Sequence, residues 1–228
     1  MRIFIILLLS LSTAAFAQRS PNPTGFYSAG EILFAWNLKL EDVGYMRLFT
    51  ERNRGWGSRE MITMVKKTAS EMDEMFPMRD RLQVGDISAM GGGQITRHNS
   101  HQNGLDADLT YYRLNGVEQL PDIFDEFSEN MIVNGKISPN FDHQRNWELM
   151  KSLHWHGKVQ RIFADQLIKQ ELCRYAQAQK EDETYVEVLR SLRHVEDHSD
   201  HLHVRLFCPE TAKNCIAQEE TPPGSGCP

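Results

Sequence analysis

The sequence lacks any excess of positive charge. It has 25 Lys and Arg residues against 31 Asp and Glu residues, a formal net charge of −6. Sequence-independent binding to nucleic acid needs a basic surface, so this class of function is excluded. After residue 17 the chain also lacks an apolar run of the roughly 20 residues that a transmembrane helix needs. No membrane span is therefore expected in the rest of the chain.

Two short patterns that would indicate other kinds of site are missing as well. The chain has no G-x-S-x-G segment, which disfavours a serine hydrolase with a nucleophile elbow. It has no C-x-x-C pair, which disfavours a cysteine-rich metal site. Wholesale disorder is excluded too, because 40% of the residues are hydrophobic and only 25% are charged.

The first residues have the pattern of a cleavable signal peptide. Arg2 supplies a positive charge, an apolar run follows, and Ala15-Phe16-Ala17 has the small-x-small spacing that signal peptidases cut. The run is too short for a membrane anchor, which needs roughly 20 apolar residues. We therefore expect residues 1–17 to be removed on export, so that the mature chain begins at Gln18.

Export makes the four cysteines candidates for disulfides, because an oxidising compartment favours pairing. Cys208 and Cys215 enclose a short loop, so of the possible pairings theirs has the smallest entropic cost of loop closure. We expect that pair. The remaining disulfide would then join Cys173 to Cys227 and tie the C-terminal tail to an internal helix.

Hydrophobic periodicity predicts several helices and strands. Apolar residues, many of them methionines, recur at helical spacing over residues 58–76, with Ser58 as the N-cap and Pro77 as the stop. We expect this stripe to be core. Further helices are expected over residues 146–153, 158–178 and 183–192. Strands are expected over residues 82–87, 105–112 and 201–207, of which the last two alternate with period two.

These elements together indicate an α+β fold in which helices pack on a mostly antiparallel sheet. The alternation over residues 105–112 predicts a strand that is half exposed to a polar cleft. Residues 18–28 are rich in Pro, Gly and Ser, so a flexible leader is expected there. No internal repeat or linker divides the remainder, and residues 29–228 are expected to form one domain.

Histidine is the residue type that the chain has in excess. All nine histidines lie between His98 and His203, and such clustering indicates metal binding or acid–base chemistry. His201 and His203 are two apart on a predicted strand, so both imidazoles project from one face. His101 and Asp108 flank a glycine in an earlier segment. Two imidazoles and one carboxylate make a zinc site that leaves a fourth position for water.

The spacing of these residues resembles a known metal signature. His101-x-x-Gly104-x-x-x-Asp108 followed by His201-x-His203 is similar to the signature of the lysostaphin, D-alanyl-D-alanine metallopeptidase and hedgehog superfamily. Flanking words narrow the resemblance to the penicillin-insensitive murein endopeptidases, over residues 25–227. These words are Arg54-Gly55-Trp56-Gly57, Gly85-Asp86-Ile87-Ser88, Gly92-Gly93, Ser100-His101-Gln102, Arg145-Asn146-Trp147 and His201-Leu202-His203-Val204-Arg205-Leu206.

The resemblance implies a role for each histidine of the signature. One Zn²⁺ would be bound by His101, Asp108 and His203. His201 would be the catalytic partner that takes up and returns a proton. His198 matches a position near the active site, where it would orient groups or stabilise charge.

Two residues near this set leave alternatives open. Asp106 shares a strand face with Asp108, so periodicity alone does not choose between them, and only the family spacing favours Asp108. His98 matches a position associated with a second metal, and a substrate contact is the alternative. Asp142 and His143 are adjacent, which differs from the wider spacing expected of two further ligands.

The resemblance therefore implies a periplasmic zinc metallopeptidase that hydrolyses peptide cross-links of peptidoglycan at the D-alanyl–meso-diaminopimelyl amide bond. Two alternatives stay open. One is a D,D-carboxypeptidase of the same superfamily, which would use the same catalytic set. The other is a non-catalytic zinc-containing module that binds the cell wall. Peptidoglycan is the expected partner in each case.

Overall fold

The computed structural model describes residues 20–228, so the expected signal peptide at residues 1–17 lies outside the described residues. Within that range the chain has the predicted α+β organisation, with helices packed on a mostly antiparallel sheet. No helix in residues 20–228 combines the length and the apolar character that a membrane crossing requires.

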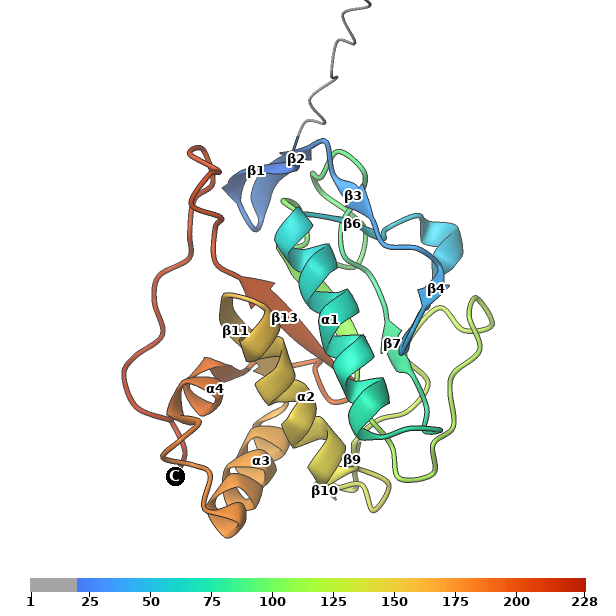
Figure 1. Ribbon diagram of the computed structural model, residues 1–228, viewed down its shortest axis with the longest axis vertical. Coiled ribbons are helices and arrows are strands. Elements are labelled where there is room, and N and C mark those ends of the chain that lie inside the picture. The colour runs from blue at the N-terminus through green and yellow to red at the C-terminus, as the bar shows by residue number, and fades with distance from the viewer. Residues whose placement is uncertain (1–19) are drawn as a thin grey trace, which may run out of the picture.

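A seven-stranded sheet forms the centre of the fold (Figure 1). Its strands are β4 (Glu41–Asp42), β5 (Tyr45–Arg47), β7 (Leu82–Val84), β8 (Asp106–Thr110), β11 (Val159–Ala164), β12 (Leu192–His194) and β13 (His201–Leu206). They are arranged in the order β12-β11-β13-β8-β7-β5-β4. The pairs β11–β12 and β5–β7 are parallel, and the other neighbours are antiparallel. Because β8 and β13 have strand neighbours on both sides, their register is firmly set.

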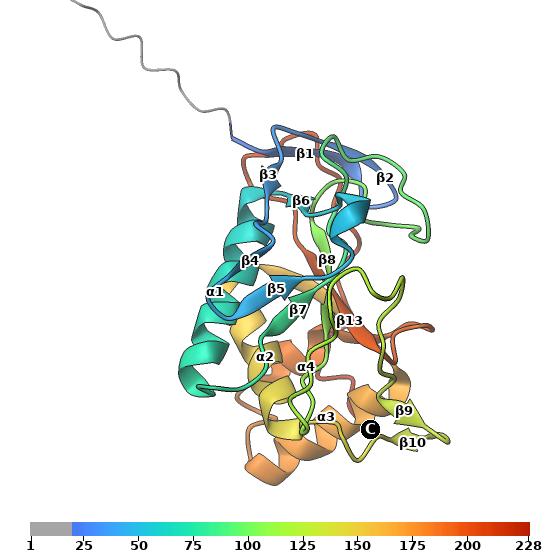
Figure 2. The same ribbon diagram turned by 90° about the vertical axis from the view of Figure 1, so that its right-hand side faces the viewer.

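Two helices cover one face of this sheet. Helix α1 (Arg59–Met75) lies beside α2 (His143–His156), and the turned view in Figure 2 shows both on the side opposite the hairpin of β9 (Ile132–Val133) and β10 (Lys136–Ile137). The Ser58 side chain accepts the amide N–H of Met61 at 3.1 Å and so caps α1. Met61, Met64 and Met72 are buried. The helix predicted over residues 58–76 is thus confirmed, and so is the burial of its methionine stripe except at Met75, which is 41% exposed.

The helix predicted over residues 158–178 is wrong in its first part. Residues Val159–Ala164 form β11, and only Gln166–Gln179 form helix α3. Val159, Ile162 and Phe163 have the i, i+3, i+4 spacing of a helix, but pairing with β12 and β13 on both sides makes this segment a strand. The signal for the boundary is Asp165, whose side chain accepts the Leu167 amide at 2.7 Å as an N-cap. Helix α4 (Val186–Ser191) lies within the range predicted over residues 183–192.

The segment expected to be a flexible leader, residues 18–28, contains a strand. β1 (Asn22–Phe26) pairs antiparallel with β2 (Ala29–Leu33), and a further short pair is formed by β3 (Trp36–Asn37) and β6 (Trp56–Gly57). Gly25 also bonds across to the C-terminal tail, donating to Asn214 and accepting from Ile216, each at 2.8 Å. The Pro and Gly residues that indicated a loop lie within β1 itself, and the hairpin with β2 together with the bonds to the tail holds the segment in place.

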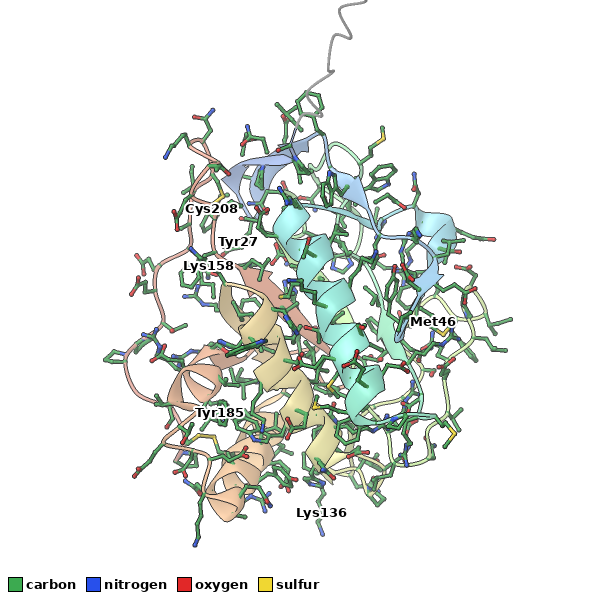
Figure 3. The ribbon with its side chains drawn as sticks, in the orientation of Figure 1. Tyr27, Met46, Lys136, Lys158, Tyr185 and Cys208 are labelled. Atoms are coloured by element: carbon green, nitrogen blue, oxygen red, sulfur yellow. A yellow bond between two sulfur atoms is a disulfide. The ribbon has the colours of Figure 1, made fainter. Side chains whose placement is uncertain are left out.

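Two disulfides hold the C-terminal tail. Cys208 pairs with Cys215, and Cys173 of α3 pairs with Cys227, which is the connectivity that the loop lengths favoured. In Figure 3, Cys208 is labelled on the same side of the molecule as Tyr27 and Lys158. The tail is rich in polar residues, Pro and Gly. The disulfide to buried Cys173 therefore supplies a link that apolar packing of the tail would not.

The two disulfides are expected to differ in their contribution to stability. They close loops with sequence separations of 54 and 7 residues. Loop-closure entropy predicts a loss of about 4 kcal/mol for Cys173→Ser with Cys227→Ser, and about 2.5 kcal/mol for Cys208→Ser with Cys215→Ser. Guanidinium unfolding of the two double variants measures this. A larger loss from the short loop would contradict the ordering.

Candidate metal and catalytic site

The two central strands of the sheet bring the two histidine-rich segments together. β8 and β13 pair antiparallel, and their register sets His203 directly opposite Asp108. Two residues further along, Arg205 lies opposite Asp106. Because side chains alternate across a strand, all four project from one face together with His201. β8 is buried throughout, so the face that the sequence predicted to be half exposed is covered by its neighbours.

His101 reaches the same face from the connection between β7 and β8. Its backbone is left-handed, with φ of 62°, and its Nδ1–H donates to the carbonyl oxygen of Ile87 at 2.8 Å. A carbonyl oxygen only accepts, so Nε2 is the nitrogen left for a metal. Gly104, with φ of +72°, lets the chain turn into β8, since a Cβ there would lie 2.7 Å from Ile32 Cδ1.

Three imidazole nitrogens converge on one oxygen of Asp108. Oδ1 lies 3.2 Å from Nε2 of His101 and 3.5 Å from Nδ1 of His203. It lies 3.8 Å from Nε2 of His201. Neither Asp108 Oδ1 nor His101 Nε2 has a hydrogen-bond partner among the described residues, although both atoms are buried. Buried polar atoms are almost always satisfied, so this unmet capacity fits a cation held by these groups.

Asp106 accepts hydrogen bonds from two histidines of the cluster. Its Oδ1 accepts from Nε2 of His203 at 2.7 Å and from Nε of Arg205 at 2.6 Å, and its Oδ2 accepts the His101 amide at 3.3 Å. The bond to His203 fixes the ring so that Nδ1 faces Asp108. Asp106 is fully buried and its oxygens are occupied by these donors. Of the two carboxylates that periodicity left open, Asp108 is therefore the one free to bind a metal.

Electrostatics in the cluster follow from these contacts. Burial would raise the pKa of Asp108, but the surrounding imidazoles, His101 first, hold it well below its usual range. Burial lowers the pKa of His101, yet the Asp108 carboxylate overcomes this and raises it to about 9. Burial, with His101 beside it, lowers the pKa of His203 to about 3. These shifts keep Asp108 ionised and His203 neutral, whereas His101 would bind a cation only after releasing its Nε2 proton.

His201 is oriented by a carboxylate of its own. Its Nδ1–H donates to Asp200 Oδ1 at 2.6 Å, so Nε2 is the nitrogen that faces Asp108. Phe127 stacks on the imidazole, with ring centroids 4.6 Å apart and an interplanar angle of 22°. Burial lowers the pKa of His201, but Asp200 and Asp108 raise it overall. This arrangement suits a group that holds a proton and passes it on.

His198 lies next to His201, with ring centroids 5.0 Å apart. Its Nδ1–H donates to the carbonyl oxygen of Glu196 at 2.7 Å. Burial and the neighbouring His201 lower the pKa of His198. Its neutral ring lines the same cleft as His201 and His203, which is where the sequence placed it.

His98 also adjoins the cluster. Its Nε2 lies 3.0 Å from Asp86 Oδ2, and its Nδ1 lies 3.8 Å from Asp108 Oδ2. The ligand atoms of His98, His101 and Asp108 all lie within 4.8 Å of one another, which makes them a candidate metal group among the described residues. This group differs from the predicted ligand set, in which His203 takes the place of His98.

Asp142 and His143 are engaged elsewhere. Asp142 Oδ1 accepts the Arg145 amide at 3.1 Å as the N-cap of α2. His143 Nε2 lies 2.8 Å from Glu171 Oε1 on α3. A capping carboxylate and a histidine paired with a neighbouring helix have ordinary structural roles, in line with the doubt that their adjacent spacing raised about them as ligands.

The cluster opens into a cleft of about 890 Å³. Besides the histidines and Asp108, the cleft is lined by Arg52, Arg97 and Phe127, which sequence reasoning did not assign to the site. Arg52 lies in the short 3-10 helix η1 (Thr50–Arg52), and Phe127 in the long connection after β8. Neither position belongs to a periodic pattern, so nothing in the sequence identified them. Asp86 could have been found from the sequence, because it lies in Gly85-Asp86-Ile87-Ser88, one of the segments that resemble the family.

Comparison with known proteins finds one family that matches nearly all of the described residues. Residues 23–228 match the model of the family described as penicillin-insensitive murein endopeptidase. A protein of that name from Haemophilus influenzae is 32% identical over 213 residues, which cover 90% of this chain and 70% of that protein. Proteins of the same name from Klebsiella pneumoniae and Yersinia pestis are 29% and 27% identical. Each match covers 91% of this chain and 74% of the relative.

Proposed function

Since the chain belongs to the family of penicillin-insensitive murein endopeptidases, it is a peptide hydrolase, and we propose that it acts as a zinc-dependent metallopeptidase. Its substrate would be the peptide cross-link of peptidoglycan. The bond cleaved would be the amide between D-alanine and meso-diaminopimelic acid. The single observation that supports the zinc most strongly is the pair of buried, unpartnered atoms, Asp108 Oδ1 and His101 Nε2.

The proposed ligands are His101, Asp108 and His203. Each presents one atom toward the same point: Nε2, Oδ1 and Nδ1 respectively. His203 fits this set better than His98, because its Nδ1 faces Asp108 Oδ1, the same oxygen that faces His101 Nε2. His98 is turned toward Asp86 and the other oxygen of Asp108. It is a candidate for a substrate contact or for a second, weaker metal.

In the proposed reaction His201 moves the proton. Zinc, when bound, would lower the pKa of water and polarise the amide carbonyl. Asp200 holds the proton on Nδ1 of His201, so Nε2 can take the proton of the attacking water and return it to the leaving amine. His198 would orient groups or stabilise charge beside it. A purely cell-wall-binding module has no need of an imidazole oriented in this way next to the ligands, which favours the enzyme.

We further propose that the protein works in the periplasm, after loss of a signal peptide at residues 1–17, as one domain that includes β1 in addition to residues 29–228. The bacterial relatives are murein endopeptidases by name, and murein is outside the cytoplasmic membrane. The two disulfides support an oxidising compartment. A D,D-carboxypeptidase would use the same catalytic residues, and the products of cleavage distinguish it.

The experiment that tests the proposed function is digestion of purified cross-linked sacculi with and without a chelator. We expect muropeptide dimers to be converted to monomers, and the chelator to abolish this conversion, because zinc supplies the activated water. Mass spectrometry identifies which bond is cut. Release of terminal D-alanine from intact dimers would indicate the carboxypeptidase instead.

Metal content provides the matching measurement. Protein purified without chelators is expected to contain close to one equivalent of zinc per chain. A metal-free but active protein would contradict the metallopeptidase. A reproducible second equivalent would assign His98 to a second site.

A further inference from the structure

The connection between β8 and β9 carries a segment that lies over the cleft. Phe127 of this segment covers the His201 ring and packs edge-on against Phe49, with ring centroids 5.1 Å apart. Gly85 leaves room for it, since a Cβ there would lie 2.7 Å from Phe127 Cζ. Five residues earlier, Asp122 is held by the Thr50 hydroxyl and accepts the amide of the next residue, Glu51, at 3.3 Å.

Between these two anchors, two arginines of the cleft hold Asp125. Arg97 Nη2 donates to Asp125 Oδ2 and Nη1 donates to the Asp125 carbonyl oxygen, both at 2.8 Å. Arg52 Nη2 donates to the same carbonyl oxygen and lies 3.3 Å from Asp125 Oδ1. Each carboxylate oxygen thus has its own guanidinium, and the main-chain carbonyl is shared by both.

Other features of the site position the two arginines for this contact. Arg52 Nη1 is fixed by Asp86 Oδ2 at 2.9 Å, which leaves Nη2 directed into the cleft. Arg97 has a left-handed backbone, with φ of 71°, and its side chain lines the cleft. Asp86 Oδ2 also lies 3.0 Å from His98, and His98 adjoins Asp108. Two side chains, those of Asp86 and His98, therefore link Arg52 to Asp108, a proposed metal ligand.

The contacts of the Asp125 side chain hold it only weakly in this position. Its side chain is 76% exposed, and the Arg97 side chain is 47% exposed. Exposed ion pairs contribute little to stability, because water solvates the separated charges well. A ligand carboxylate can therefore compete with the Asp125 side chain for the two arginines.

We propose that Arg52 and Arg97 form a carboxylate-binding subsite for the substrate, and that Asp125 occupies it until a diaminopimelyl carboxylate displaces it. This proposal rests on the proposed function, because it names the group by which the same cleft recognises the cross-link. The diaminopimelyl residue of a cross-link presents a free carboxylate next to the nitrogen of the scissile amide, and a carboxylate is the side-chain group of Asp125 that the arginines hold.

The test compares two purified muropeptide dimers, one with free and one with amidated diaminopimelyl carboxylates, as substrates of the zinc-loaded protein. Wild type is expected to favour the free dimer by roughly 10- to 100-fold in kcat/KM, the worth of charge-assisted bonds to an arginine. Arg97→Gln is expected to reduce this preference to less than roughly threefold by weakening cleavage of the free dimer alone. Asp125→Asn is expected to act in the opposite sense and raise the preference, because it removes the charge that competes for the arginines.

The opposite signs separate a binding role from a structural one. If the Arg97–Asp125 pair only braced the loop, both substitutions would lower cleavage of both dimers together, and that result overturns the proposal. Arg174→Gln is the matched control, since Arg174 lies exposed on α3 and pairs with Glu171; its preference should equal that of wild type. Wild type that cleaves both dimers equally well overturns this inference alone. Wild type that cleaves neither overturns the proposed function.

Discussion

His203→Ala is expected to lose most of its zinc together with its activity, whereas His201→Ala keeps near-stoichiometric zinc and loses roughly 10²–10⁴-fold in rate. The two residues lie on one face of β13, two positions apart. His203 presents Nδ1 toward Asp108 at 3.5 Å and contributes directly to metal affinity. His201 is held by Asp200 and lies farther from the same oxygen, at 3.8 Å, so its loss removes a proton carrier.

Zinc content by elemental analysis and dimer cleavage on the same preparations decide between these roles. His98→Ala is a useful third variant, because His98 belongs to the other candidate group of ligands. It should retain close to one equivalent of zinc if His203 is the ligand. If His98→Ala lost its zinc and His203→Ala retained it, His98 would be the ligand in place of His203. Full activity of His201→Ala would remove the proposed mechanism.

The second large effect separates Asp106 from Asp108. Asp106→Ala is expected to lower the free energy of unfolding by about 3–5 kcal/mol, because it leaves the buried Arg205 guanidinium without its carboxylate. It should also weaken zinc binding by roughly 10- to 100-fold through loss of the bond that orients His203. Asp108→Asn should lose zinc with a smaller cost in stability. Its neighbours are imidazoles, which become neutral by releasing a proton, and an arginine cannot do so.

Guanidinium unfolding in the presence of a chelator measures the stability difference without the contribution of metal binding. Zinc titration of the folded variants measures the affinities. A larger loss of stability for Asp108→Asn than for Asp106→Ala would show that the roles of the two carboxylates are reversed. Asp106→Asn tests charge at constant shape, since an amide oxygen still accepts from Arg205 but no longer neutralises it.

Much of the site could be predicted because metal ligation needs particular residue types at particular spacings. Imidazoles two apart on a strand must share a face, and this held for His201 and His203. Capping and periodicity identified α1, since Ser58 and the methionine stripe are local signals. The β11 strand was mistaken for helix, because its apolar residues have helical spacing and its strand partners are distant in the sequence.

What the sequence determined by itself was the chemistry available: which imidazoles and carboxylates could bind zinc, which cysteines could pair, and which family the pattern resembles. These follow from residue identity and short-range spacing, which the chain carries locally. The structural support for Asp108 over Asp106 as the proposed ligand comes only from the tertiary structure, because it depends on Arg205 and His203 across the β8–β13 register. Only the tertiary structure placed Phe127 on His201 and Asp125 between two arginines. Those contacts join segments that are far apart along the chain, and their partners are set by how the sheet and its loops pack.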